Sequence, residues 1–157
     1  MSYSVRPMQV GEEAAVEAVM LASVRTLGLR GYAPEQVEAW AGRAQLFRIG
    51  PRIEAGASVL LASEDSGEPV AYALIEPDGH FDHLYCHPNH AGHGLGTRLI
   101  EAAENLARQR GIKRLFTEAS ELARPVFARA GYVELHRRDL EINGVAIHNF
   151  AMEKRIR

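Results

Sequence analysis

Cysteine is almost missing from this sequence: of 157 residues, only Cys86 is one. A single cysteine cannot form an internal disulfide, so the chain lacks the feature that stabilises many small secreted domains. The sequence also has no apolar run of the length that a signal peptide or a membrane span requires. We therefore expect a cytoplasmic protein, and we interpret Cys86 as a small side chain in a strand rather than as a catalytic thiol.

A strong net charge is lacking as well. The formal net charge at pH 7 is −2, so no general electrostatic field favours nucleic acid or an anionic membrane. Internal repeats and low-complexity linkers are absent, and 46% of the residues are hydrophobic. A chain of this length can bury about two-thirds of its unfolded surface. These observations predict one domain over residues 1–157, with no nucleic-acid partner and no membrane partner.

The spacing of the apolar residues predicts a mixture of strands and helices. Alternating or continuous apolar residues indicate strands over residues 3–7, 58–63, 70–76, 81–86, 115–117, 132–142 and 145–152. Helical spacing indicates helices over about residues 12–25, from 34, from 95 to the glycine at 111, and over 122–130. Asn143-Gly144 is the strongest hairpin signal and predicts a type I′ turn. The predicted order is β, α, α, β, β, β, α, β, α, β, β, with an antiparallel meander in the centre.

Residues 84–100 are the most informative stretch, and they predict a buried strand, a glycine-rich loop and a helix. Gly92, Gly94 and Gly96 remove Cβ atoms at alternate positions, so that backbone N–H groups can turn toward one ligand. The helix that follows directs its N-terminus into the loop, which favours a phosphate. A P-loop requires a lysine after its last glycine, and the dinucleotide fingerprint requires G-x-G-x-x-G. This loop has neither feature.

The same stretch resembles the GNAT acetyltransferase superfamily. In this family a strand ends in a pattern like L-Y-V-H-P, which Leu84 to Pro88 match. The acetyl-CoA loop of the family follows with the pattern Q/R-x-x-G-x-G/A, which this sequence matches at Gly94 and Gly96. It has Ala91 where the family prefers Gln or Arg. Residues 117–132 and 143–154 add to the resemblance, which is similar to YafP-type bacterial members. It implies a single-domain α/β (α+β) fold with a central mixed, mostly antiparallel sheet flanked by helices.

The resemblance also implies an activity, an N-acetyltransferase with acetyl-CoA as co-substrate. The acceptor would be a primary amine of a small molecule or peptide, and transfer would be direct, in a ternary complex. His93 falls where the family often has a basic residue beside the pyrophosphate, and Ser120 falls where many members have Asn, although it could also cap a helix. The residues implied to bind the cofactor are Leu84, Tyr85, Cys86, Ala91, Gly92, His93, Gly94, Leu95, Gly96, Thr97, Ser120 and Phe127.

Three residues are candidates for the general base. Strand alternation places His80 and Asp82 on one face and His83 on the other. In the family that this sequence resembles, this part of the strand borders the acceptor amine, so Asp82 and His80 are candidates, and Glu118 is a further one. Asp82 could instead cap the turn after Gly79, and Glu118 could be a surface carboxylate.

Phe127 is the main departure from the family. It occupies the position of the family's common general-acid tyrosine, and phenylalanine has no proton to donate. Tyr32, Tyr85 and Tyr132 are alternative donors, although Tyr132 is expected to pack in the core. A thiolate could also leave unaided and take its proton from water.

Other classes of protein stay open. A non-catalytic acyl-CoA sensor is compatible with Phe127 and Ala91, and a nucleotide-binding protein is compatible with the glycine loop. Five histidines between residues 80 and 93 raise the question of a metal-binding module, but no H-E-x-x-H or paired C-x-x-C frames a site, so no metal is expected. The late hairpin could pair across a homodimer.

Overall fold

The computed structural model describes residues 2–157. Within them the chain forms β1 (Tyr3–Pro7), α1 (Glu13–Leu27), α2 (Pro34–Leu46), α3 (Gly50–Glu54), β2 (Ser58–Glu64), β3 (Pro69–Ile75), β4 (Phe81–Cys86), α4 (Leu95–Gln109), β5 (Arg114–Ala119), α5 (Arg124–Arg129), β6 (Val133–Ile142) and β7 (Val145–Arg155). The predicted order is confirmed, with the short helix α3 and two 3₁₀ turns added. None of the helices in this part of the chain has the length and apolar character that a bilayer crossing requires.

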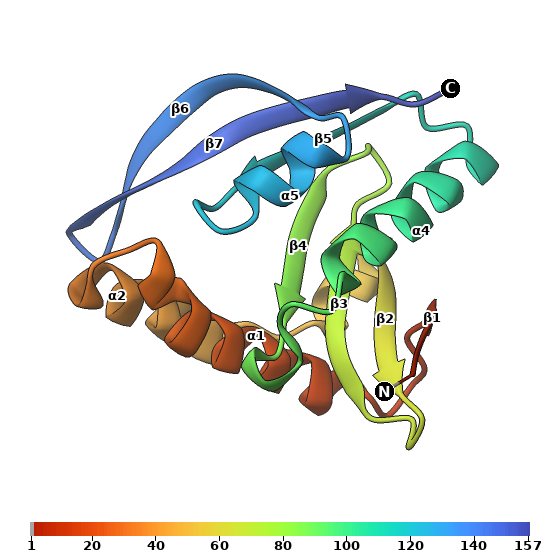
Figure 1. Cartoon of the computed structure of the whole chain (residues 1–157), viewed down its shortest axis with the longest axis horizontal. Helices are drawn as coiled ribbons and strands as arrows, with labels where there is room; N and C mark the ends of the chain where they lie inside the picture. Colours follow the sequence, from red (N-terminus) through yellow and green to blue (C-terminus); the bar gives the residue numbers. More distant parts are fainter. Residues whose placement is uncertain (1) are drawn as a thin grey trace.

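The strands form two sheets, each antiparallel throughout. The first has the order β1-β2-β3-β4, and the second has the order β5-β7-β6. In residues 2–157, the two sheets are joined by one isolated parallel bridge, between His80 and Phe116. The predicted fold of mostly antiparallel strands flanked by helices is confirmed, with the refinement that its sheet is in two parts rather than continuous. Beyond the bridge β4 and β5 diverge, as Figure 1 shows, so no further hydrogen bonds form between them.

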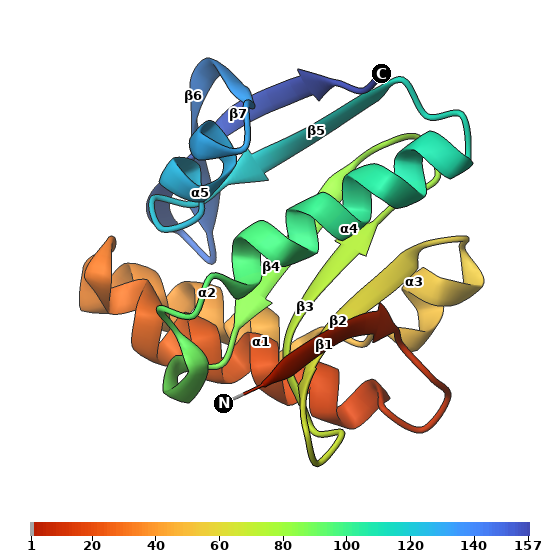
Figure 2. The ribbon, with the colours of Figure 1, turned by 45° about the vertical axis from the view of Figure 1, so that its right-hand side comes forward.

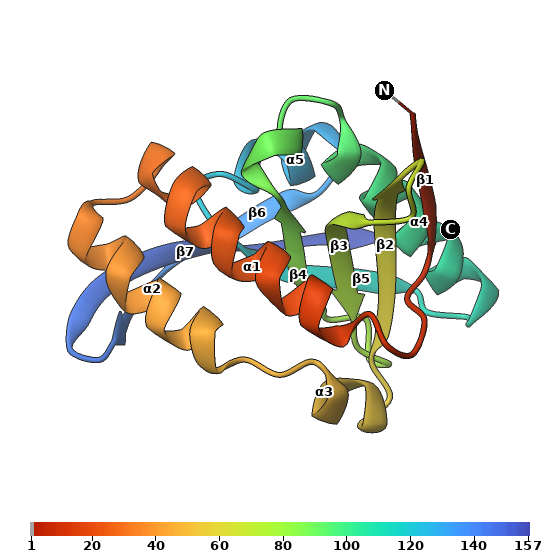
Figure 3. The ribbon, with the colours of Figure 1, turned by 90° about the horizontal axis from the view of Figure 1, so that it is seen from below.

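Helices cover both faces of the four-stranded sheet. Figures 2 and 3 show α4 on one face and α1 with α2 on the other. Strand β3 is buried along its whole length, because each face of it packs against a helical layer. Tyr72 and Leu74 pack with α1 and α2, whereas Ala73 and Ile75 pack with α4. The predicted apolar stripe of α4 is buried here through Leu95, Leu99 and Ala103.

A β-bulge interrupts β4 near the bridge between the sheets. Leu74 pairs with His83 and Ile75 pairs with Phe81, so Asp82 has no partner on β3. An extra residue of this kind shifts the alternation of side chains by one position. As a result Phe81 lies in the core under α4, and His83 lies among the aromatic rings on the opposite face.

The predicted hairpin closes the second sheet. Asn143 and Gly144 have φ values of +50° and +79°, the two positive values that a type I′ turn requires. The turn joins β6 and β7, which pair from Val133 with Glu153 to Ile142 with Val145. The tip of this hairpin lies beside α2, as Figure 1 shows.

Candidate active site

The glycine-rich loop before α4 leaves a row of backbone donors free. Gly92 and Gly94 have φ values of +83° and +72°, a left-handed conformation that glycine adopts without steric cost. Gly94 is also the N-cap residue of α4. Across the described part of the chain, no acceptor is hydrogen-bonded to the N–H groups of residues 92–97. Consecutive free donors at the positive end of a long helix have the arrangement expected of a phosphate site.

Gly96 serves packing rather than backbone conformation. A Cβ atom at Gly96 would lie 3.3 Å from Cγ1 of Val126 and 3.8 Å from Cδ2 of Leu84. The missing side chain therefore lets the first turn of α4 lie close to both α5 and the end of β4.

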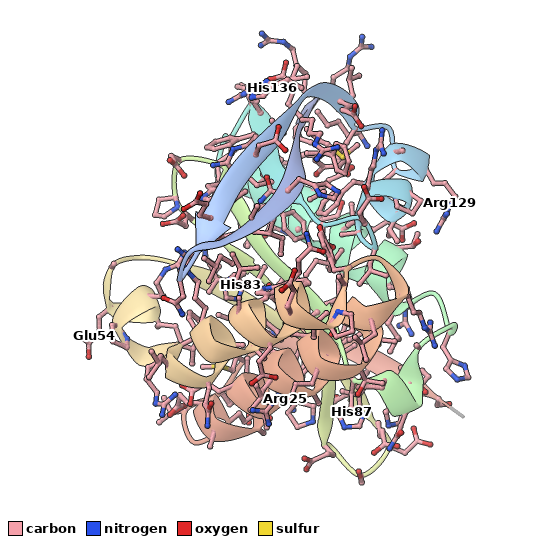
Figure 4. The ribbon with its side chains drawn as sticks, turned by 90° about the vertical axis from the view of Figure 1, so that its left-hand side faces the viewer. Arg25, Glu54, His83, His87, Arg129 and His136 are labelled. Carbon is pink, nitrogen blue, oxygen red and sulfur yellow. The ribbon has the colours of Figure 1, made fainter. Side chains whose placement is uncertain are left out.

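A cavity of about 310 Å³ lies beside this loop. We call it the donor cavity, after the acetyl donor that the sequence leads us to expect there. Arg30 and Arg129 line it as well, and neither guanidinium has an ion-pair partner within residues 2–157. Figure 4 shows Arg129 extending from α5 at the periphery of the molecule. The predicted cofactor residues that line the donor cavity are Leu84, Tyr85, Cys86, Ala91, Gly92, Gly94, Leu95, Gly96, Thr97 and Ser120.

Two of the predicted cofactor residues lie elsewhere. The side chain of His93 is exposed, and its ring contacts that of Tyr3 in β1 at a centroid distance of 5.7 Å. Phe127 lines a second cavity instead. The donor cavity therefore recruits basic side chains from Arg30 and Arg129, which are distant from the loop in sequence, rather than the basic residue expected within it.

The thiol of Cys86 faces the donor cavity but is not activated. Burial raises the pKa of Cys86 to about 11, so the thiol stays protonated at neutral pH. This environment is consistent with the interpretation of Cys86 as a small, partly buried side chain.

The second cavity, of about 590 Å³, lies between α2, the end of β4, β5 and the β6–β7 hairpin; we call it the acceptor cavity. Figure 4 shows His83 in the space between the hairpin and helices α1 and α2. Ser120 lines both cavities, and its Oγ accepts a hydrogen bond from the N–H of Ala123 at 3.1 Å. The N-cap residue of α5 is Ala123, so Ser120 is not the helix cap that the sequence suggested. The donor and acceptor cavities meet at five residues, Trp40, Leu84, Tyr85, Ser120 and Ala123.

Charged side chains gather where β4 and β5 begin to diverge. Arg52 of α3 places its Nη2 2.6 Å from Oδ2 of Asp82 and 3.4 Å from Oε1 of Glu76. His80 lies between two carboxylates, with Nδ1 2.6 Å from Glu76 and Nε2 2.7 Å from Glu118. The structure therefore brings Glu118 to His80 and Asp82, which the sequence had placed together, and adds Arg52 and Glu76 to them.

His80 does not fit the role of a general base at neutral pH. Hydrogen bonds that the ring donates to Glu118 and Glu76 raise the pKa of His80 to about 9, although burial opposes the charged form. Both ring nitrogens are occupied by carboxylates and the ring is protonated, so it has no lone pair to offer. Its stacked contact with Phe116, at a centroid distance of 5.0 Å, fixes the ring further. His80 is better described as a positioning residue that orients Glu118.

We expect His80→Gln to destabilise the protein in a pH-dependent way. The pKa of His80 is about 9 in the folded protein, against 6.5 for an unperturbed histidine. The stabilisation is therefore fully present below pH 6.5 and is lost as the pH rises through 9, and it is worth about 2 kcal/mol after allowance for solvent screening. Urea unfolding of both proteins at pH 6 and pH 10 should give a stability difference that is large at pH 6 and small at pH 10. An equal difference at both pH values would contradict a charged His80.

Because of the bulge, Asp82 and His83 do not point to opposite faces of β4 as strict alternation predicts. Burial favours the protonated form of Asp82, but the hydrogen bond from Arg52 and the positive charge of His80 oppose it, and the pKa of Asp82 lies below its usual value. Burial lowers the pKa of His83 to about 4, so its imidazole is neutral at neutral pH. Nδ1 of His83 lies 2.8 Å from the hydroxyl of Tyr72. Alternation had placed His83 on the face away from Asp82, yet its Nε2 is 3.7 Å from the Asp82 carboxylate.

The histidine run does not converge. Figure 4 shows His83 and His87 well apart, and His90 instead contacts Tyr3 through a 2.9 Å hydrogen bond. Glu76, His80 and Asp82 are the one group in residues 2–157 whose ligand atoms lie within 4.8 Å of one another. Since Arg52 pairs with both carboxylates of this group, a cation already occupies its centre.

The tyrosines differ in their access to the cavities. The hydroxyl of Tyr132 is buried without a hydrogen-bond partner in the described residues, which agrees with its expected place in the core. Tyr32 donates its hydroxyl proton to the carbonyl of His148 at 2.8 Å and accepts from the N–H of Glu121 at 2.9 Å. Tyr85 lines both cavities at their junction. Tyr32 and Tyr85 both line the acceptor cavity and remain candidates for the proton donor.

We expect Phe127→Tyr to preserve or raise activity. Phe127 is 1% exposed, packs against Phe81 and Tyr132, and lines the acceptor cavity. A hydroxyl that reaches the cavity would find polar surroundings and add a proton donor. The measurement is kcat/KM against a reactive amine, together with the melting temperature. A large loss of stability would show that the hydroxyl is trapped in the core without a partner.

Comparisons with known proteins agree with this architecture. One similar structure is a protein from Rhodopseudomonas palustris described as "GCN5-related N-acetyltransferase: aminotransferase, class-II". The two structures superpose with a TM-score of 0.86 and share 36% sequence identity, over 99% of this chain and 97% of that one. This chain also superposes on the PaiA N-acetyltransferase from Thermoplasma acidophilum in complex with coenzyme A (TM-score 0.77, 17% identity, 99% of each chain). A third match is YncA from Salmonella typhimurium with its cofactor acetyl-CoA (TM-score 0.67, 19% identity, 100% of this chain and 95% of that one).

The sequence comparisons identify the family. A comparison with curated proteins gave no match. A sequence model of the family described as "Acetyltransferase (GNAT) domain" matches residues 29–154, a longer stretch than the motifs alone suggest. This match covers most of the chain and includes the loop, the bulged strand and the hairpin. The chain belongs to the GNAT acetyltransferase family.

Proposed function

We propose that this protein transfers an acetyl group from acetyl-CoA to a primary amine of a small molecule or peptide, with both substrates bound together. Membership of the GNAT family supports the reaction class, and related structures have been solved with coenzyme A or acetyl-CoA. We also propose that the protein is a YafP-type member of the family and that it is cytoplasmic. It would form a homodimer through β6, which is an edge strand of its sheet.

One observation carries this proposal. The free N–H groups of residues 92–97 border the donor cavity, the carboxylates of Asp82 and Glu118 border the acceptor cavity, and the two cavities meet beside Leu84 and Tyr85. A diphosphate held at the loop would leave the end of β4 beside the thioester group. The free donors and the absence of a Cβ at Gly92 and Gly94 fit such a group.

The reaction sets a proton balance that the acceptor cavity has to meet. As the C–S bond of the thioester breaks and a C–N bond forms, one proton leaves the amine nitrogen and one reaches the sulfur. Glu118 is the carboxylate best placed to receive the first proton, directly or through water. Its Oε1 is held by His80, and its Oε2 has no partner among residues 2–157. Asp82 is a weaker base, because Arg52 stabilises its charged form.

A binding and turnover assay tests the proposal. Acetyl-CoA should raise the melting temperature of the protein, whereas ATP and NAD should not, since the donor cavity lacks the P-loop lysine and the dinucleotide spacing. A panel of primary amines should then release free coenzyme A thiol in the presence of acetyl-CoA. Stabilisation without turnover on any amine would instead favour an acyl-CoA sensor. Stabilisation by a nucleotide alone would favour a nucleotide-binding protein.

A further inference from the structure

The acceptor cavity contains more positive charge than its carboxylates neutralise. Arg52 is paired with Asp82, and Glu118 is paired with the protonated His80. Arg43 and Arg138 also line the cavity. In residues 2–157 the guanidinium of Arg43 has no hydrogen-bond or ion-pair partner, and that of Arg138 has only the neutral amide oxygen of Asn149, at 3.2 Å.

The two arginines belong to opposite walls of the same cavity. Arg43 is in the last turn of α2, and Arg138 is in the middle of β6. Along β6 the cavity is lined by Arg138, Leu140 and Ile142, as expected for alternating residues of a strand. Arg137 does not line it and pairs with Asp139 at 3.0 Å.

Hydrogen bonds hold these two walls together. Nε2 of Gln36 in α2 donates to the carbonyl of Ala146 in β7 at 3.0 Å, and the hydroxyl of Tyr32 donates to the carbonyl of His148 at 2.8 Å. These bonds fix the start of α2 against the hairpin before any ligand binds, and Arg43, in the last turn of the same helix, and Arg138 border one opening.

The rest of the cavity wall is largely apolar and aromatic. Trp40, Phe47 and Tyr85 line it, together with Ile142 and Ile147. Leu46 also lines it and is 81% exposed, a large apolar side chain with little burial in the absence of a ligand. A ligand for this cavity needs an apolar body, one anionic group for the arginines, and an amine for the carboxylate end.

We propose that the acceptor is an amino acid with an apolar or aromatic side chain, and that Arg43 and Arg138 bind its carboxylate. This inference rests on the function proposed above and adds the class of substrate to it. Guanidinium groups recognise carboxylates through paired, charge-assisted hydrogen bonds. A peptide N-terminus has a neutral amide carbonyl where a free amino acid has its carboxylate, so a peptide acceptor is disfavoured.

Matched acceptors and variants test the inference. Phenylalanine, phenylalanine amide and phenethylamine are offered as acceptors with saturating acetyl-CoA to the wild type, Arg43→Gln, Arg138→Gln and the double variant. Each single substitution should raise the KM for phenylalanine about tenfold, as expected for the loss of one charge-assisted contact, and should leave the KM for the two acceptors without a carboxylate within about twofold. Arg137→Gln, one residue along β6 but outside the cavity, is the matched control and should change none of these values.

A binding measurement separates this inference from the proposed function. Binding of N-acetylphenylalanine and of its amide is measured by calorimetry in the presence of coenzyme A, which requires no turnover. Tighter binding of the carboxylate form that is lost in the Arg43→Gln/Arg138→Gln variant supports the inference, even if no amine is acetylated and the proposed function fails. The inference is overturned if N-acetylphenylalanine and its amide bind equally well, or if the variant loses the same affinity for both. Turnover of amines in that case would leave the proposed function intact.

Discussion

Gly94→Glu is expected to abolish useful acetyl-CoA binding, with a loss in affinity of about a hundredfold or more. The N–H groups of residues 92–97 have no partner within residues 2–157, and Gly94 is the N-cap of α4. A carboxylate at this position would compete for the same donors and repel a diphosphate. Loss of charge-assisted hydrogen bonds and like-charge repulsion each cost about 1.5–3 kcal/mol or more at such a site. Isothermal calorimetry with acetyl-CoA measures the loss.

Two controls isolate the charge from the backbone. Gly94→Ala introduces the left-handed strain of a non-glycine residue without a charge, so it should cost stability and little affinity. Gly111→Glu places the same side chain at a glycine with φ +71°, also with open space around its Cβ, but at the other end of α4. Normal acetyl-CoA affinity in Gly94→Glu would mean that the loop does not hold the phosphates.

Glu118→Gln is expected to lower kcat by about a hundredfold or more, the effect typical of losing a general base. The amide keeps the size of the side chain, and its oxygen can still accept the hydrogen bond from Nε2 of His80. It cannot receive a proton from the amine. Because Glu118 does not line the donor cavity, affinity for acetyl-CoA should stay unchanged. Steady-state kinetics with a saturating acceptor, together with calorimetry, provide both numbers.

Asp82→Asn distinguishes the two carboxylates. Its main contact is with Arg52, so we expect a smaller effect on kcat and a larger one on stability than for Glu118→Gln. The reverse order, with Asp82→Asn nearly inactive and Glu118→Gln active, would identify Asp82 rather than Glu118 as the base.

Local features of the sequence predicted the elements well, because their causes are local. Asn143-Gly144 requires positive φ at both residues and formed the expected turn. Pro34 begins α2, where its missing N–H costs nothing. The glycines at 92 and 94 define a loop whose conformation depends on these residues themselves.

The parts that were missed depend on contacts between distant segments. Strict alternation placed His83 away from Asp82, and the bulge, which depends on the register between β3 and β4, reversed this. Arg52 reaches Asp82 from a helix 30 residues earlier in the chain, and no sequence pattern joins the two. The protonated state of His80 likewise depends on Glu118, which is 38 residues away.

The protonated thiol of Cys86 has a kinetic consequence. Cys86 is the single cysteine of the chain and lies in the wall of the donor cavity. In a ping-pong reaction, its sulfur would carry the acetyl group as a covalent intermediate between the two half-reactions. With its pKa raised to about 11, too little thiolate is present at neutral pH to make such a relay efficient. This property of Cys86 supports the proposed direct transfer over a ping-pong order through this thiol, and in direct transfer the junction of the two cavities would hold both reactants at once.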